Sequence, residues 1–372
     1  MLNEIRRISS NLGKIALDVN IGKLKDVPNN KLGDKIKVNI LKQPSKNWAA
    51  KVDSIESPFV EVYDADEYGA NKALTLMGLF ETRSMLKAFG IGSNEQTEYQ
   101  KKPLKNKEYF IAGTGTGREL INLAALGANV TGIDATLGYV NLTASKLGEV
   151  ASVLDPNQTI FLSQCPAEDY PYKFNSLDGI SSLFGVINHI QDWKDQLRKF
   201  GDALKGDGKL VIEKYGSNEA LVFKLRKNGQ LKYDPSILQR RDPKGKGILL
   251  GDSEDVLPAN FPSDRQFRWQ LEDSGLEIQK KIGFLRIASL FPKDPTAQNL
   301  TMFMELVSQT DQKAYDFLYQ FQSSEDLLLA AFMYDLQSQR RKKNPINIED
   351  FAYVLYEGRK RKTEEYLKNI SR

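Results

Sequence analysis

The chain has 372 residues, of which 41% are hydrophobic and 27% are charged, and its formal net charge is +4. This length exceeds what one ordinary core organises, so we expect a folded central domain with appended segments. No apolar run approaches the ~18 residues that cross a bilayer. The opening stretch MLNEIRRISS lacks the apolar region of a secretory signal, so we expect neither a membrane protein nor a secreted one.

Cys165 and His189 are the only cysteine and the only histidine. A single cysteine excludes an internal disulfide and fits a reducing compartment, so we expect a cytoplasmic protein. A zinc site built from histidine and cysteine ligands is also excluded, because one residue of each kind cannot supply the four ligands. No cluster of Asp and Glu indicates magnesium either, and we therefore expect no metal site.

Positive charge gathers in two stretches. Residues 340–372 hold ten Lys/Arg and five Asp/Glu, and residues 224–247 hold eight Lys/Arg and two Asp. Such stretches can attract phosphates, or they can be a solvated helix face and a surface loop.

The first 107 residues are divided into two parts. Residues 1–58 are expected to form an N-terminal arm or small β-rich appendage, with short strands at 15–19 and 35–40. Residues 59–107 are expected to form a lid helix and a linker. Apolar spacing predicts the helix over 72–89, and Tyr63 and Tyr68 precede it.

The stretch from Tyr109 to Asp134 reads as strand, glycine turn, helix, strand and acid. Three strand-forming residues come first, and Gly113, Gly115 and Gly117 follow. Gly127 ends the amphipathic helix, as a C-cap glycine does. The pattern is the first βαβ unit of a doubly wound sheet, in which ligands bind at the carboxyl ends of the strands.

The central domain is expected over 108–290. After Asp134, the predicted elements are a helix at 139–154, strands at 159–162 and 178–184, a helix at 193–204 and a strand at 209–213. A polar insertion at 216–262 is followed by a helix at 263–275 and strands at 276–278 and 283–290. Residues 291–372 have helical periodicity and predict a C-terminal helical extension, with a final helix at about 347–369.

The glycine turn has the spacing GxGxG, which differs from the GxGxxG of dinucleotide sites, and Arg118 stands where a P-loop would continue with lysine. Glycines let a ligand approach the backbone, and the helix that begins after Gly117 can meet a carboxylate. Asp134 can accept hydrogen bonds from the two hydroxyls of a ribose. A ribose with a carboxylate-bearing tail indicates S-adenosylmethionine.

Four segments, AGTGTGRELINLAALGANVTGID, PAEDYPY, LDGISSLFGVINHI and LKGDGKLVIEK, occur in an order and spacing that resemble the class I S-adenosylmethionine-dependent methyltransferases. The resemblance covers residues 108–290. It implies an α/β fold with a doubly wound, Rossmann-like, seven-stranded sheet. It also implies that S-adenosylmethionine is bound and that S-adenosylhomocysteine is the product.

The resemblance also implies roles for individual residues. The methionine portion would meet the three glycines, and the ribose would meet Asp134. The other residues implied at the cofactor are Ala135 and Tyr139 beside the adenine, Ala167 and Glu168 at its edge, Leu183 and Phe184 beside the sulfonium, and Tyr63 and Tyr68 in a lid. Two positions depart from the family pattern, because Ile111 and Pro166 stand where an acid is frequent.

His189 is the candidate catalytic residue. Its pKa suits a general base near neutral pH, and the competing interpretation is a structural residue at the end of the fourth strand. We expect a methyltransferase that acts on an oxygen or nitrogen nucleophile, most simply of a small molecule. An enzyme that methylates RNA or protein through the basic segments, and a catalytically silent relative, remain alternatives.

Overall fold

The fold is described from a computed structural model. The description covers residues 36–40, 60, 64, 72–92, 101–155, 157–216, 225–227, 230–232, 246–250, 256–292, 295–339, 346, 348 and 351–361. The predicted strand at 15–19 and the lid tyrosines Tyr63 and Tyr68 lie outside these residues.

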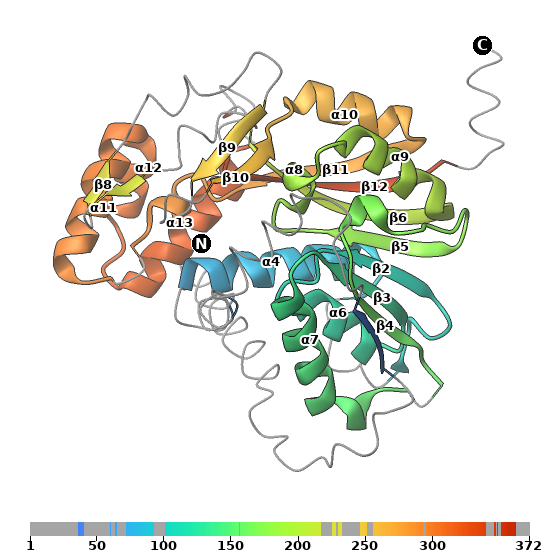
Figure 1. The fold of residues 1–372 in the computed structure, drawn as a ribbon. Helices are drawn as coiled ribbons and strands as arrows, with labels where there is room; N and C mark the ends of the chain where they lie inside the picture. The colour runs from blue at the N-terminus through green and yellow to red at the C-terminus, as the bar shows by residue number, and fades with distance from the viewer. Residues whose placement is uncertain are drawn as a thin grey trace.

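One eight-stranded sheet runs through the described residues in the order β1-β4-β3-β2-β5-β6-β12-β11 (Figure 1). The pairings from β1 to β6 are parallel, whereas β12 is antiparallel to both β6 and β11. The strands are β1 (Ile36–Ile40), β2 (Glu108–Ala112), β3 (Asn129–Asp134), β4 (Ile160–Gln164), β5 (Leu177–Ser182), β6 (Leu204–Tyr215), β11 (Leu276–Phe284) and β12 (Tyr353–Lys360). The expected doubly wound, seven-stranded sheet is confirmed, and β1 adds a further strand at its edge.

Helices cover both faces of this sheet (Figure 1). One core lies beneath α4 (Lys72–Ala88), α6 (Arg118–Ala125) and α7 (Leu137–Glu149), and the other beneath α8 (Val186–His189), α9 (Trp193–Ala203) and α10 (Asp264–Asp273). Parallel strands between two helical layers are buried on both faces, which explains their nearly continuous apolar runs. No helix among the described residues has the length and apolar character needed to cross a bilayer.

In the part of the chain that the structure describes, three further α-helices lie between β11 and β12. They are α11 (Ala297–Thr310), α12 (Gln312–Leu318) and α13 (Ser324–Ser338). Phe80 of α4 contacts Phe284 of β11 and Phe332 of α13 with ring centroids 5.1 and 5.4 Å apart. The α11–α13 helices therefore extend the core beneath α4.

The final helix predicted at 347–369 is wrong where the structure describes it, because residues 353–360 form strand β12. Val354 and Tyr356 pack into one core and Leu355 into the other. A strand buried on both faces shows no alternation of apolar and polar residues, so periodicity alone could not separate it from a helix. Similarly, β11 is one continuous strand that ends at Phe284, and a 3₁₀ turn occupies Ala288–Leu290 where a separate strand was predicted.

The insertion at 216–262 contains two small antiparallel pairs. One pair is β7 (Leu225–Lys227) with β8 (Gln230–Lys232), and the other is β9 (Lys246–Leu250) with β10 (Val256–Asn260). The end of β10 is held at the carboxyl edge of the sheet, because the Asn260 side-chain amide donates to the carbonyl of Ile190 at 2.8 Å.

Candidate functional site

The glycine turn lies at the carboxyl end of β2, beside the ends of β3 and β5. Gly113, Gly115 and Gly117 have φ angles of 79°, 49° and 88°, in the left-handed region that favours glycine. A Cβ at Gly113 would lie 2.4 Å from a methyl of Val186, and one at Gly117 would lie 2.9 Å from the hydroxyl of Thr143. The outer two glycines are therefore needed for packing.

Gly115 differs from its two neighbours, because a Cβ built there meets no atom within 4 Å. Its backbone consequently faces open space at the carboxyl edge of the sheet. Thr114, next to it, is 1% exposed, and its hydroxyl has no hydrogen-bond partner among the described residues. An open glycine beside a buried, unsatisfied hydroxyl fits a polar ligand that approaches the turn.

Asp134 stands at the end of β3 and is tied to the glycine turn. One carboxylate oxygen accepts from the backbone amide of Gly115 at 2.9 Å, and the other accepts from the amide of Thr136 at 2.9 Å. Each carboxylate oxygen has two lone-pair sites, so one accepted hydrogen bond does not by itself exhaust it. The half-buried side chain is thereby held in one orientation, as the recognition of a diol requires.

The loops after β3 and β4 contain the residues predicted near an adenine. Tyr139 and Ala167 are each 7% exposed, and the carbonyl of Ala135 accepts from the side chain of Gln164 at 3.1 Å. The carboxylate of Glu168 accepts from the backbone amide of Gln191 at 3.0 Å. In the structure, Glu168 therefore ties the loop after β4 to the segment that leads into α9.

The end of β5 has an unusual backbone. Phe184 and Gly185 follow one another with φ angles of 58° and 66°, which is strained for a bulky residue such as phenylalanine. A Cβ at Gly185 would lie 2.5 Å from the ring of Tyr215. This turn brings the end of β5, including the buried Leu183, against the end of β6.

His189 belongs to an aromatic cluster formed by Phe184, His189, Tyr215, Phe261 and Tyr353. The imidazole Nε2 lies 3.3 Å from the hydroxyl of Tyr215, and the two rings are nearly perpendicular. Tyr215 also contacts Tyr353 and Phe261, with centroids 5.4 and 6.0 Å apart, and Phe184 contacts Tyr353 at 6.1 Å. Tyr215, Phe261 and Tyr353 were not predicted, because their meeting depends on strand pairing between distant segments.

The segment before α4 reaches the glycine turn through Asp64. Its carboxylate pairs with Lys146 of α7, and the same ammonium group donates to the carbonyl of Thr116 at 3.2 Å. Thr143 of α7 also donates to the carbonyl of Gly115 at 3.2 Å. The carbonyl groups of the turn are thus held from the side of α7.

No group of three or more His, Cys, Asp or Glu side chains in the described part of the chain is arranged to hold a metal ion. Cys165 is buried, and desolvation raises the pKa of its thiol to about 11. A thiol with this pKa is protonated at neutral pH and is a weak nucleophile.

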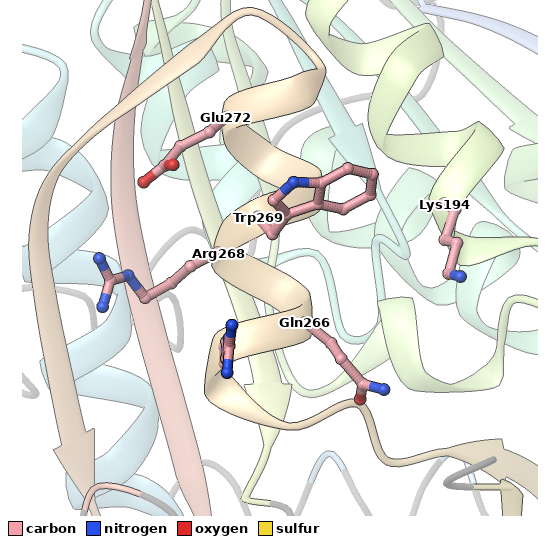
Figure 2. Close-up of a pocket in the computed structure, with 6 residues that line it drawn as sticks. Lys194, Gln266, Arg268, Trp269 and Glu272 are labelled. Atoms are coloured by element: carbon pink, nitrogen blue, oxygen red, sulfur yellow. The ribbon is translucent and has the colours of Figure 1, made fainter.

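A groove of about 460 Å³ lies on the surface between the beginnings of α9 and α10 (Figure 2). Trp269 is 62% exposed there, and Figure 2 shows its ring and the side chain of Gln266 on the side of Lys194, with Arg268 and Glu272 on the other side of α10. The groove is lined by Lys194, Arg265, Gln266, Arg268, Trp269 and Glu272, none of which belongs to the glycine turn.

Residues 111–212 match the family described as "Methyltransferase domain". Over 122 residues the chain is 28% identical to the ubiquinone/menaquinone biosynthesis C-methyltransferase UbiE of Geotalea daltonii. That match covers 32% of this chain and 50% of the relative, so the chain spans about half the length of the curated relative that it matches.

The chain is also similar to solved structures. A putative S-adenosylmethionine dependent methyltransferase from Listeria monocytogenes is 13% identical with a TM-score of 0.41, over 73% of this chain and 99% of that one. A phosphoethanolamine N-methyltransferase 2 from Haemonchus contortus, in complex with phosphomonomethylethanolamine and S-adenosylhomocysteine, is 16% identical with a TM-score of 0.46, over 86% of this chain and 62% of that one.

The matched residues, 111–212, contain the glycine turn, Asp134, the loop after β4 and the turn after β5. The strand order around them, with one antiparallel strand between the last two parallel ones, is the doubly wound sheet that the sequence predicted. Residues 111–212 of the central domain therefore match a methyltransferase domain, as the resemblance to the class I S-adenosylmethionine-dependent methyltransferases predicted.

Proposed function

We propose that this protein transfers a methyl group from S-adenosylmethionine to an oxygen or nitrogen nucleophile of a small molecule. The observation that carries the proposal is the junction of Gly115 and Asp134. An open glycine backbone and an oriented carboxylate, joined by a 2.9 Å hydrogen bond, lie together at the carboxyl edge of the sheet. They suit the two polar ends of one ligand, an amino-acid group and a ribose.

The remaining cofactor contacts are proposed from the same edge. Ala135 and Tyr139 would flank the adenine, and Ala167 with the backbone at Glu168 would meet its edge. Leu183 and Phe184 would lie beside the sulfonium, and Tyr63 and Tyr68 would cover the site as a lid. When bound, the cofactor supplies an electrophilic methyl group, and the protein needs chiefly to orient the acceptor and exclude water.

The aromatic cluster is the proposed acceptor side of the site. It lies at the ends of β5, β6 and β12, and Asn260 anchors the 216–262 insertion beside it. Its half-buried members, Phe184, His189 and Tyr353, present apolar rings with one titratable nitrogen. Such a surface suits a small, largely apolar acceptor, which favours a small molecule over a protein side chain or RNA.

His189 is the proposed general base. Its Nε2 faces the hydroxyl of Tyr215 at 3.3 Å, so a proton released by an acceptor near Tyr215 can reach this nitrogen. We expect His189→Gln to lower turnover by about 100-fold and to remove the histidine ionisation from the pH–rate profile, while binding of S-adenosylhomocysteine is retained. Near-normal turnover with an unchanged pH profile would leave His189 as a structural residue.

Calorimetric titration with S-adenosylmethionine and S-adenosylhomocysteine tests the whole proposal. We expect both to bind, and ATP and NAD to fail to compete, because the GxGxG turn lacks the lysine and the spacing of phosphate sites. If neither S-adenosylmethionine nor S-adenosylhomocysteine binds, the methyltransferase proposal is refuted and the catalytically silent relative is favoured.

The groove beside Trp269 favours one second candidate, an RNA-directed methyltransferase. An exposed tryptophan with Lys194, Arg265 and Arg268 offers a stacking surface and cations for a single strand. Of the two basic segments, 224–247 lies largely outside the described residues, and 340–362 is described at 346, 348 and 351–361. This candidate requires that single-stranded RNA binds, that affinity falls steeply with salt, and that Trp269→Ala weakens binding. Salt-independent affinity, or an unchanged affinity in Trp269→Ala, would refute it.

A further inference from the structure

A buried cluster of charges connects α4 to the residue that follows the glycine turn. Arg118, the first residue of α6, is 8% exposed, and its guanidinium lies 2.9 Å from a carboxylate oxygen of Glu81 on α4. Glu81 is fully buried. The guanidinium Nε also donates to the carboxylate of Glu119 at 2.9 Å, and Thr82 of α4 donates to the same oxygen at 3.4 Å. Two helices are thus joined through one guanidinium.

A glycine inside α4 makes room for this guanidinium. A Cβ built at Gly78 would lie 1.5 Å from one terminal nitrogen of Arg118 and 2.6 Å from its central carbon. Glycine is a poor helix former, and Gly78 lies in the middle of a 17-residue helix. The close approach of Arg118 is the physical reason for a glycine at this position.

The backbone of Arg118 is continuous with the turn. Gly117 has a left-handed φ of 88°, and Arg118 follows it directly. On the other side, Thr143 and Lys146 of α7 hold the carbonyls of Gly115 and Thr116. The turn is therefore held from two sides, by α7 through its carbonyls and by α4 through Arg118.

We propose that Glu81 and Gly78 of α4 are positioning residues for cofactor binding, acting through Arg118 on the glycine turn. This inference rests on the proposed function. It extends the cofactor site to a helix that lies outside the matched residues 111–212. Because the turn meets the amino-acid end of the cofactor, disturbing α4 lowers the binding affinity that this end contributes. The adenosine end, which faces Asp134 and the loops after β3 and β4, is held by separate contacts.

The test compares two ligands that differ only at the amino-acid end, S-adenosylhomocysteine and 5′-methylthioadenosine, by calorimetry. In Gly78→Ala and in Glu81→Gln we expect the Kd for S-adenosylhomocysteine to rise at least tenfold. The Kd for 5′-methylthioadenosine should change less than threefold. Gly92→Ala is the matched glycine control, because a Cβ there meets nothing within 4 Å, and Glu305→Gln, at an exposed position of α11, is the matched acid control.

Three outcomes have distinct meanings. Failure of the wild type to bind either ligand would refute the proposed function itself. Binding by the wild type with equal losses for both ligands in the variants would overturn the positioning role and leave a general packing role for α4. Unchanged affinity for both ligands would overturn it as well. If Glu81→Gln does not fold, Gly78→Ala and Arg118→Lys, which keep every charge, still decide the question.

Discussion

Replacing Asp134 by asparagine removes one negative charge and keeps the size of the side chain. The carboxylate accepts from two backbone amides, those of Gly115 and Thr136, both at 2.9 Å. An asparagine can accept with only one oxygen, so one of these amides would face the side-chain NH₂ group, donor against donor. In the proposed complex, one ribose hydroxyl would also lose its acceptor.

Hydrogen bonds to a charged group contribute about 1.5–3 kcal/mol each. Loss of one such bond to the ribose, with weakening of the second, should cost about 2–4 kcal/mol of binding free energy. This corresponds to a rise of about 30-fold to 1,000-fold in the Kd for S-adenosylhomocysteine. The unsatisfied amide should lower the free energy of unfolding by about 1–3 kcal/mol.

Calorimetric titration and urea unfolding measure the two effects separately. Asp178→Asn is the matched control, because Asp178 also accepts from a backbone amide, that of Glu108 at 2.8 Å, but at the opposite edge of the sheet. We expect this control to lose stability without losing affinity. An Asp134→Asn variant that binds S-adenosylhomocysteine as tightly as the wild type would refute the assignment of Asp134 to the ribose.

Three further predictions concern stability and reactivity. Gly113→Ala, which forces a Cβ within 2.4 Å of Val186 at a φ of 79°, should cost about 2–4 kcal/mol of unfolding free energy. Gly115→Ala should cost about 1 kcal/mol and chiefly lower cofactor affinity, and equal urea midpoints for the two variants would contradict this. The Cys165 thiol, whose pKa burial raises to about 11, should react with a disulfide reagent at pH 8 only after denaturation, whereas rapid reaction of the native protein would contradict its burial. Burial raises the pKa of the Asp335 carboxyl from 3.8 to about 6, against backbone hydrogen bonds that lower it. The folded state then binds the proton more tightly, so the stability that Asp335 contributes should fall by about 2 kcal/mol as pH rises from about 4 to about 6. The difference in urea stability between wild type and Asp335→Asn, measured across this range, should shrink as pH rises, and a constant difference would contradict the raised pKa.

The proposed cofactor side of the site follows largely from local sequence. The strand, the left-handed glycines, the helix and Asp134 follow one another within 26 residues, and each signal depends on near neighbours. A glycine with positive φ and an acid at the end of a strand keep their meaning wherever the chain places them. The structure has the predicted strand, glycine turn and acid, and it adds the hydrogen bond between Gly115 and Asp134, which the pattern did not predict.

The proposed acceptor side depends on residues that are distant in sequence. Tyr215 and Tyr353 meet because β12 pairs with β6, at a register that sets these two residues opposite each other. The sequence predicted a helix at Tyr353, since a strand buried on both faces has no periodicity of its own. The glycine at position 78 is visible in the sequence, but its close contact with Arg118 is not.

The sequence by itself therefore determined the resemblance to the methyltransferases, the order of the first strands and the glycine turn, because local backbone chemistry encodes them. Only the tertiary structure decided which strand completes the sheet, which rings surround His189 and how α4 reaches the glycine turn. Those contacts arise when packing brings together segments that are up to about 150 residues apart along the chain.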